Sequence, residues 1–203
     1  MPLKPSGFSD FDFEQLLSPN RAINSKISLA LDGIPNDFVV LFIVDLKNYA
    51  GTVVELLRVL QLENNTGVYL TINKPVEDLI RTFKAQRLDT EKIFFIDAIS
   101  ALSERKTLES QNIILLDSPT DLIEINNIVS KKIALEESKF VVFDSLSTLL
   151  LYNKPMAVEK FLHVLVGKMR GSRVKGFLIT VKSSEHAGLI ETISQFVDKI
   201  VEI

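Results

Sequence analysis

Residues 38–62 read FVVLFIVDLKNYAGTVVELLRVLQL, and this stretch decides the fold class. Its first part, Phe38–Val44, is an unbroken run of apolar side chains, which is typical of a strand buried on both faces of a sheet. Residues 52–62 then place apolar side chains at helical spacing, with Thr52 near the start and Asn64–Asn65 after the end. A buried strand that leads through a short loop into a helix is the repeating unit of a parallel α/β sheet.

The rest of the chain repeats this alternation. Apolar runs predict further strands at residues 68–72, 92–96, 140–143, 176–181 and 199–203. Helical patterns predict helices at residues 76–86, 121–135, 156–169 and 188–196, and residues 97–118 look less regular. We therefore expect a three-layer α/β/α fold with a mostly parallel sheet. A single domain over residues 24–203 would follow an irregular N-terminal arm over residues 1–23.

The composition excludes several kinds of site. The chain has 203 residues, of which 46% are hydrophobic and 24% charged, so it is long enough to bury a core without other support. It has no cysteine, which excludes disulfides, zinc–thiolate centres and thiol catalysis. Its net charge of −3 gives no overall electrostatic case for nucleic acid. The apolar runs are too short to cross a membrane, and the N-terminus lacks a secretory signal, so we expect a cytoplasmic protein without a membrane partner.

The N-terminal arm carries a cluster of large apolar side chains. Two interpretations remain open: the cluster docks on the surface of its own domain, or it binds a partner. The cluster consists of Phe8, Phe11, Phe13, Leu16 and Leu17.

The segment DLKNYAGT, residues 45–52, stands where an α/β protein would carry a phosphate-binding loop. That loop has the pattern G-x-x-x-x-G-K-[ST], whose backbone N–H groups and lysine hold the phosphates. In this frame Asp45 replaces the first glycine, Gly51 replaces the lysine, and Thr52 keeps the hydroxyl that binds magnesium. Lys47 lies at the wrong position to substitute, because it does not emerge from the start of the helix. The pattern predicts that the loop does not bind phosphate as a working loop does.

Two other strand ends matter for catalysis. The strand at 68–72 ends in Asn73 and Lys74, so no carboxylate stands there to activate a water molecule. The strand at 140–143 ends in Asp144, followed by Ser145 and Ser147. Asp144 is placed either to support a magnesium ion or to cap the turn by bonding a following serine.

The remaining polar residues offer little chemistry. The chain has only two histidines, His163 and His186, too few for a multi-histidine site, so we expect no metal site. Ser183, Glu185 and His186 are triad residue types, but they are adjacent on one loop and no G-x-S-x-G elbow is present. A local basic patch is either a solvated edge or a contact for an acidic partner or nucleic acid. It comprises Lys168, Arg170, Arg173, Lys175 and Lys182.

The order of these segments resembles the RecA superfamily, and within it the KaiC-like ATPase branch common in archaea. The resemblance covers residues 24–203 and is carried by five short pieces. They are Gly33-Ile34-Pro35 with the strand that follows, VYLTINKPVEDLIRTF (68–83), KIFFIDAIS (92–100), FVVFDSLSTLL (140–150) and the closing FVDKIVEI (196–203). By this resemblance Thr52 matches the Walker A hydroxyl and Asp144 the Walker B acid. By the same resemblance, Gly51 stands at the position of the Walker A lysine. Asn73 and Lys74 stand at the positions of the catalytic glutamate pair.

The resemblance implies a vestigial nucleotide site without catalytic residues. Its members would be Asp45, Lys47, Asn48, Gly51, Thr52 and Asp144. We expect a pseudo-ATPase, not an enzyme, that acts as a regulatory or scaffold subunit through a protein partner or side-by-side self-association. Two alternatives stay open: a nucleotide sensor that binds ATP or ADP weakly with magnesium, and a DNA-binding accessory protein of the RecA type.

Overall fold

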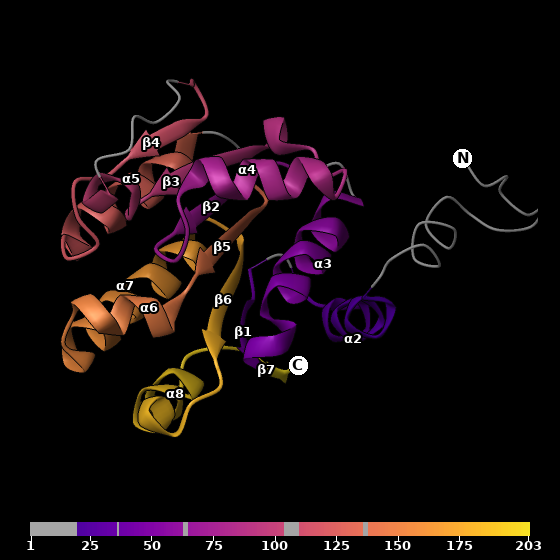
Figure 1. Cartoon of the computed structure of the whole chain (residues 1–203). Coiled ribbons are helices and arrows are strands. Elements are labelled where there is room, and N and C mark those ends of the chain that lie inside the picture. The colour runs from indigo at the N-terminus through magenta and orange to yellow at the C-terminus, as the bar shows by residue number, and fades with distance from the viewer. Residues whose placement is uncertain (1–19, 36, 63–64, 104–109, 136–137) are drawn as a thin grey trace, which may run out of the picture.

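The computed structural model describes residues 20–35, 37–62, 65–103, 110–135 and 138–203 (Figure 1). The strands within these ranges are β1 (Val39–Val44), β2 (Gly67–Thr71), β3 (Ile93–Asp97), β4 (Ile113–Leu115), β5 (Phe140–Asp144), β6 (Lys175–Val181) and β7 (Lys199–Glu202). The helices are α2 (Arg21–Leu31), α3 (Tyr49–Leu62), α4 (Val76–Ala85), α5 (Leu122–Leu135), α6 (Leu146–Tyr152), α7 (Pro155–Gly171) and α8 (Ala187–Ser194). None of the helices in these ranges is both long and apolar enough to cross a membrane.

The described strands form one parallel sheet in the order β4-β3-β2-β5-β6-β1-β7. β6 therefore separates β1 from β5, and β2 lies on the far side of β5. In register, Val44 of β1 pairs with Val181 of β6, and Asp144 of β5 pairs with Thr71 of β2. Because the strands are parallel, the carboxyl ends of β1, β5 and β2 lie at the same edge of the sheet, where open α/β sheets bind ligands.

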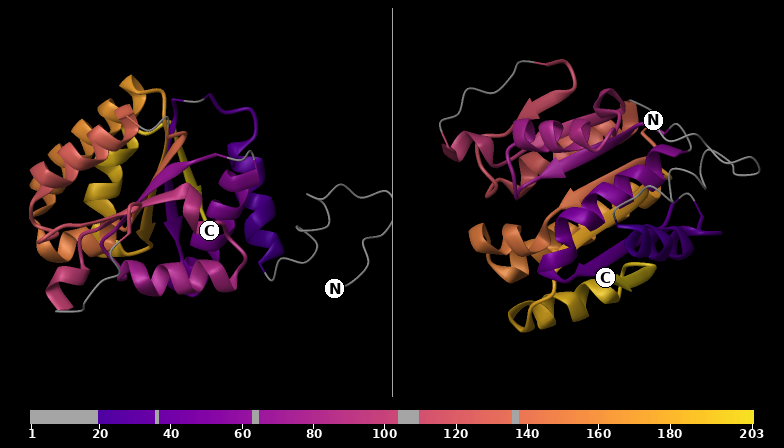
Figure 2. Two further views of the ribbon diagram at one scale, coloured as in Figure 1. Left: turned by 90° about the horizontal axis from the view of Figure 1, so that it is seen from above. Right: turned by 45° about the vertical axis from the view of Figure 1, so that its right-hand side comes forward.

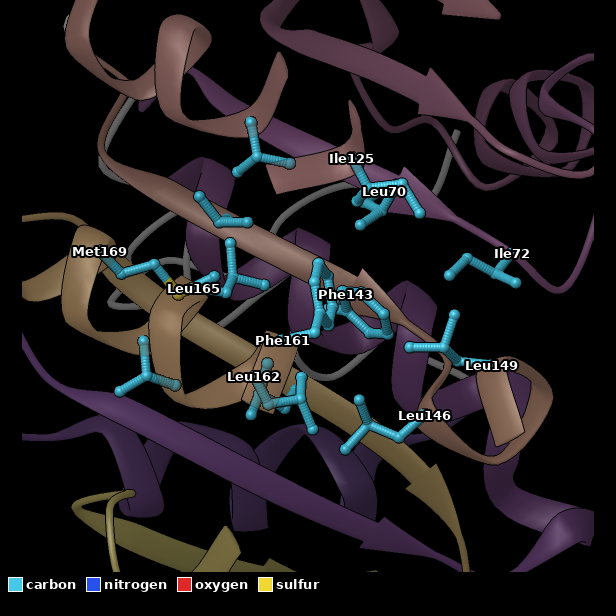
Figure 3. Close-up of a cluster of buried hydrophobic side chains, with 14 of the residues drawn as sticks. Leu70, Ile72, Ile125, Phe143, Leu146, Leu149, Phe161, Leu162, Leu165 and Met169 are labelled. Atoms are coloured by element: carbon cyan, nitrogen blue, oxygen red, sulfur yellow. The ribbon is translucent and has the colours of Figure 1, made fainter. Parts of the chain in front are cut away.

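Helices cover both faces of the sheet, so the fold is a three-layer α/β/α sandwich (Figure 2). α2, α3 and α4 pack on one face, around Phe42, Tyr69 and Phe177. α5, α6, α7 and α8 pack on the other face, where Phe143 meets Phe161 at 5.9 Å between ring centroids (Figure 3). Because both faces are covered, β1, β2, β3 and β5 are buried along their whole length, as their continuous apolar runs predict.

Local signals set several helix ends. α4 follows Pro75 and has Glu77 and Asp78 in its first turn, as predicted, since acidic side chains stabilise a helix N-terminus. α7 begins with Pro155, whose fixed φ suits the first turn, and ends with Lys168 and Arg170 in its last turn.

The structure differs from the sequence-based elements in four places. α3 begins at Tyr49, three residues before the predicted start at Thr52, so helix replaces part of the expected loop. β4 and α6 lie in stretches where no element was predicted, because each is short. α2 was not predicted either, and the expected boundary between residues 23 and 24 falls inside it. The cluster Phe8–Leu17 lies outside the described residues.

Candidate functional site

The candidate site lies at the carboxyl edge of β1, β5 and β2, and it begins with the loop after β1. Leu46–Asn48 form a short 3-10 turn that runs directly into α3. Three backbone N–H groups of residues 45–49 donate to carbonyl groups of the protein itself. Asp45 N donates to Ile203 O at 2.8 Å, Asn48 N donates to Asp45 O at 2.8 Å, and Tyr49 N donates to Leu46 O. These three N–H groups therefore do not face outward as a cradle for phosphate.

The start of α3 is filled by neighbouring protein. Thr52 is fully buried, and its hydroxyl donates to the carbonyl of Asn48 at 2.9 Å. A Cβ at Gly51 would lie 2.9 Å from Cγ of Asn20, so the Asn20 side chain occupies the space that a longer residue at position 51 needs. The hydroxyl of Thr52 and the missing side chain of Gly51 thus both serve local packing.

Asp144 is the most unusual residue of the site. Its side chain is 1% exposed at the end of β5, in the middle of the sheet. The hydroxyl of Tyr49 donates to Oδ1 of Asp144, and the hydroxyl of Tyr69 donates to Oδ2. Tyr49 comes from the first residue of α3 and Tyr69 from the middle of β2, so two neighbouring elements close over one carboxyl group.

Burial also changes the ionisation of this group. Removal from water raises the pKa of Asp144 to about 7, because the charged form loses its hydration. Burial likewise raises the pKa of Tyr69 above its usual value, so this tyrosine stays a neutral donor through the physiological range. Near neutral pH the centre of the site is therefore a partly protonated acid between two phenols.

The end of β2 is occupied by a turn and a small polar cluster. The Thr71 hydroxyl donates to Lys74 O at 2.7 Å, which closes the turn after the strand. Asn73 Oδ1 accepts a hydrogen bond from the Thr148 hydroxyl at 3.4 Å. Of the two interpretations of Asp144 left open by the sequence, the one in which it caps the following turn by bonding a serine is wrong. Ser145 is the cap of α6 and accepts from Thr148 N at 3.4 Å, whereas both oxygens of Asp144 are taken by tyrosines.

The structure brings only some of the predicted site residues together. Thr52 and Asp144 are buried at the sheet edge, Asn48 and Gly51 are half-buried, and Asp45 and Lys47 are exposed. Sequence reasoning missed Tyr49 and Tyr69, which make the closest contacts to Asp144. No sequence signal identifies them, because a tyrosine in an apolar strand or at a helix start is equally typical of a core residue.

The other polar groups singled out from sequence have structural roles. The Ser183 hydroxyl accepts a hydrogen bond from Glu185 N at 3.2 Å, so these two residues, which are of the types found in catalytic triads, form a local turn. The His163 ring packs edge-on against Phe196, with 5.4 Å between centroids. In the described part of the chain, no group of three or more histidine, aspartate or glutamate residues is arranged to hold a metal ion.

The basic patch is partly neutralised within the fold. Arg170 forms an ion pair with Asp198 at 2.8 Å, and Lys182 forms one with Glu202 at 3.1 Å. Lys168 donates to a backbone carbonyl of α5 at 3.5 Å. Arg170 and Lys182 are thus engaged by carboxylates.

Comparison with known proteins supports the architecture. A KaiC-like protein from the hyperthermophilic archaeon Pyrococcus horikoshii OT3 has a similar structure, with a TM-score of 0.55 and 17% sequence identity. The similarity covers 74% of this chain and 63% of that chain, so this chain spans less than two thirds of that protein. At this identity the likeness establishes the RecA/KaiC-like fold. The curated proteins contain no match.

A protein-family model matches a large part of the sequence. It covers residues 61–203, from the end of α3 through β7, and is described as a family of unknown function. The match includes Asp144 and Tyr69 but begins after Tyr49 and the loop of residues 45–52. Since it covers more than half of the chain, this protein belongs to the family of unknown function DUF7504.

Proposed function

We propose that this chain is a RecA/KaiC-like domain that does not hydrolyse ATP and serves as a regulatory or scaffold subunit for other proteins. The observation that carries this proposal is the closure of Asp144 by Tyr49 and Tyr69. A magnesium ion at such a site is held by one or two carboxylates together with substrate phosphates. Here both carboxylate oxygens accept hydrogen bonds from phenols, and the side chain is 1% exposed. These residues do not fit a magnesium–nucleotide complex.

The loop and the end of β2 support the same proposal independently. The N–H groups of Asp45, Asn48 and Tyr49 are used within the protein, and Asn20 fills the space beside Gly51. Asn73 and Lys74 offer no carboxylate to orient an attacking water. Phosphoryl transfer depends on positioning and charge stabilisation, so the absence of a phosphate lysine and of such a carboxylate would each cost orders of magnitude in rate.

The test is a thermal-shift titration with ATP and magnesium, run beside a phosphate-release assay. A ligand at 100 times its Kd stabilises the folded state by about 2.7 kcal/mol, which raises the Tm of a chain of this size by roughly 5–10 °C. We expect no such shift and no phosphate release above background. A rise in Tm without turnover would instead favour a nucleotide sensor, and clear turnover would overturn the proposal.

A paired variant sharpens this test. The double substitution Tyr49→Phe and Tyr69→Phe removes both phenol donors from Asp144 while keeping the rings that fill the core. If the tyrosines alone prevent magnesium–nucleotide binding, this variant gains a Tm shift with ATP and magnesium that the wild type lacks. If the loop also prevents binding, as its hydrogen bonds indicate, both proteins stay unresponsive.

A further inference from the structure

An apolar groove runs between α5 and α7, on the face of the sheet opposite to α2. It has a volume of about 420 Å³, and most of its wall is apolar, including Leu122, Ile123, Phe161 and Val164. Ile123 is 76% exposed and Val164 48% exposed. Large apolar side chains exposed along one groove are typical of an interaction site.

The charged side chains in this groove have one sign. Among the described residues that line it, Lys160 and Lys168 carry the charge. They lie two helical turns apart on α7, on the same stripe as Val164 and the 66% exposed Met156. Neither lysine forms an ion pair with another residue in the described ranges. The groove is therefore complementary to a segment that carries both apolar and acidic side chains.

The chain itself contains such a segment in its N-terminal arm. Residues 8–17 read FSDFDFEQLL, with five large apolar side chains, three acidic side chains and no basic one. This segment lies outside the described part of the chain. Its apolar side chains match the apolar wall of the groove, and its acidic side chains match the two lysines. We propose that residues 8–17 of one copy of this chain dock in the α5–α7 groove of a second copy.

The fold explains why the second copy is needed. Leu17 is three residues before Asn20, so it lies within about 11 Å of that residue. Asn20 precedes α2 on the α2–α3 face, and α5 and α7, whose side chains line the groove, lie on the other face of the sheet (Figure 2). Two helix–sheet layers of about 10 Å each, plus several strands at about 4.8 Å spacing, separate the two places. The complete segment cannot lie in the groove of its own copy.

Docking of this kind joins two different surfaces, arm to groove, and so makes a head-to-tail contact. Repeated contacts of this type close into a ring or extend into a filament. This inference rests on the proposed scaffold role, because it names the surface for protein association. It does not depend on nucleotide, so its test contains none and its outcome is separate from that of the ATPase assay.

The test uses two full-length variants, each defective on one side of the contact. Ile123→Asp places a charge in the groove and keeps the arm, whereas the double substitution Phe11→Ser and Phe13→Ser changes the arm and keeps the groove. Sedimentation velocity and light scattering give the mass of each protein. We expect wild-type chain to assemble with rising concentration and each variant alone to stay monomeric, with association weakened at least about 30-fold. Mixing the two variants should give a single 1:1 dimer, because one intact arm meets one intact groove.

Leu46→Asp is the matched control, since Leu46 is as exposed as Ile123, at 76%, but lies in the loop after β1. It should assemble like the wild type. Circular dichroism checks that each variant is folded. Ile123→Asp should fold normally, because Ile123 is exposed. Three results would overturn the inference: a wild-type chain that stays monomeric at 200 µM (about tenfold above a weak micromolar Kd), assembly that neither variant weakens, or mixed variants that form no dimer.

Discussion

Replacing Asp144 by asparagine should change how the stability of this protein depends on pH. Burial raises the pKa of Asp144 from 3.8 to about 7 in the folded protein. A carboxyl with a raised folded pKa keeps its proton in the folded state when the unfolded chain has already released it. The contribution of Asp144 to stability is therefore greatest below about pH 4, falls as the pH rises toward 7, and levels off above it. At about 1.4 kcal/mol for each pH unit, the full loss is about 4 kcal/mol.

The tyrosines make this figure a ceiling. Hydroxyl donors favour the charged carboxylate and so oppose the effect of burial on the pKa of Asp144. An asparagine side chain at this position stays neutral at every pH, and its amide can accept from one tyrosine hydroxyl and donate to the other, since a phenol does both. We expect Asp144→Asn to match the wild type near pH 5 within about 2 kcal/mol and to exceed it near pH 8 by up to about 4 kcal/mol.

The assay is urea denaturation followed by circular dichroism at pH 5, 6, 7 and 8, with both proteins in the same ionic strength. Asp117→Asn, at an exposed aspartate, is the control and should follow the wild type. Parallel loss of stability in wild type and Asp144→Asn between pH 5 and pH 8 would refute the reasoning. It would mean that Asp144 is charged at pH 5 and that the phenols outweigh its burial.

The packing of the fold supports three more predictions. Gly51→Lys should not produce ATP hydrolysis in a phosphate-release assay and should lower the Tm, because its Cβ would lie 2.9 Å from Asn20 Cγ; phosphate release above background would contradict this. Asp97→Ala should lower the free energy of unfolding, measured by urea denaturation, by at least about 2 kcal/mol. The reason is that the buried carboxylate accepts from Val76 N at 2.7 Å and from other backbone donors. A loss below about 0.5 kcal/mol would show that these donors bind water in the variant. Leu162→Ala, at a fully buried position, should lower the free energy of unfolding by about 3 kcal/mol in the same assay. A loss under about 1 kcal/mol would mean that α7 shifts to fill the cavity.

Much of the fold follows from local patterns in the sequence. The run Phe38–Val44 predicts β1, and FVVF at 140–143 predicts β5, because a strand covered on both faces has no polar side to interrupt it. Helix periodicity places α5 and α7 within two residues of their observed ends. α2 escaped prediction, and so did α6, which has only seven residues and depends on packing against its neighbours more than on its own propensity.

The candidate site shows where sequence reasoning stops. The residues that the resemblance places at the lysine and carboxylate positions, Gly51, Asn73 and Lys74, can be read from the chain, because each is an identity at a fixed distance from a strand end. The contacts of Asp144 are not visible. Tyr49 and Tyr69 are 95 and 75 residues away from it in sequence, and only the pairing of β2 with β5 and the early start of α3 bring them to it.

The sequence by itself thus determined the α/β class and excluded sites that need cysteine, and it predicts the loss of catalytic residues; all three depend on composition and short-range spacing. The tertiary structure alone decided that Asp144 is buried between two phenols, that the N–H group of Asp45 donates to Ile203 O, and that an apolar groove with two lysines stays open between α5 and α7. Those features arise when elements distant in sequence pack together. Burial and hydrogen-bond partners, which set the ionisation of an acid or the exposure of a surface, exist only in that packed state.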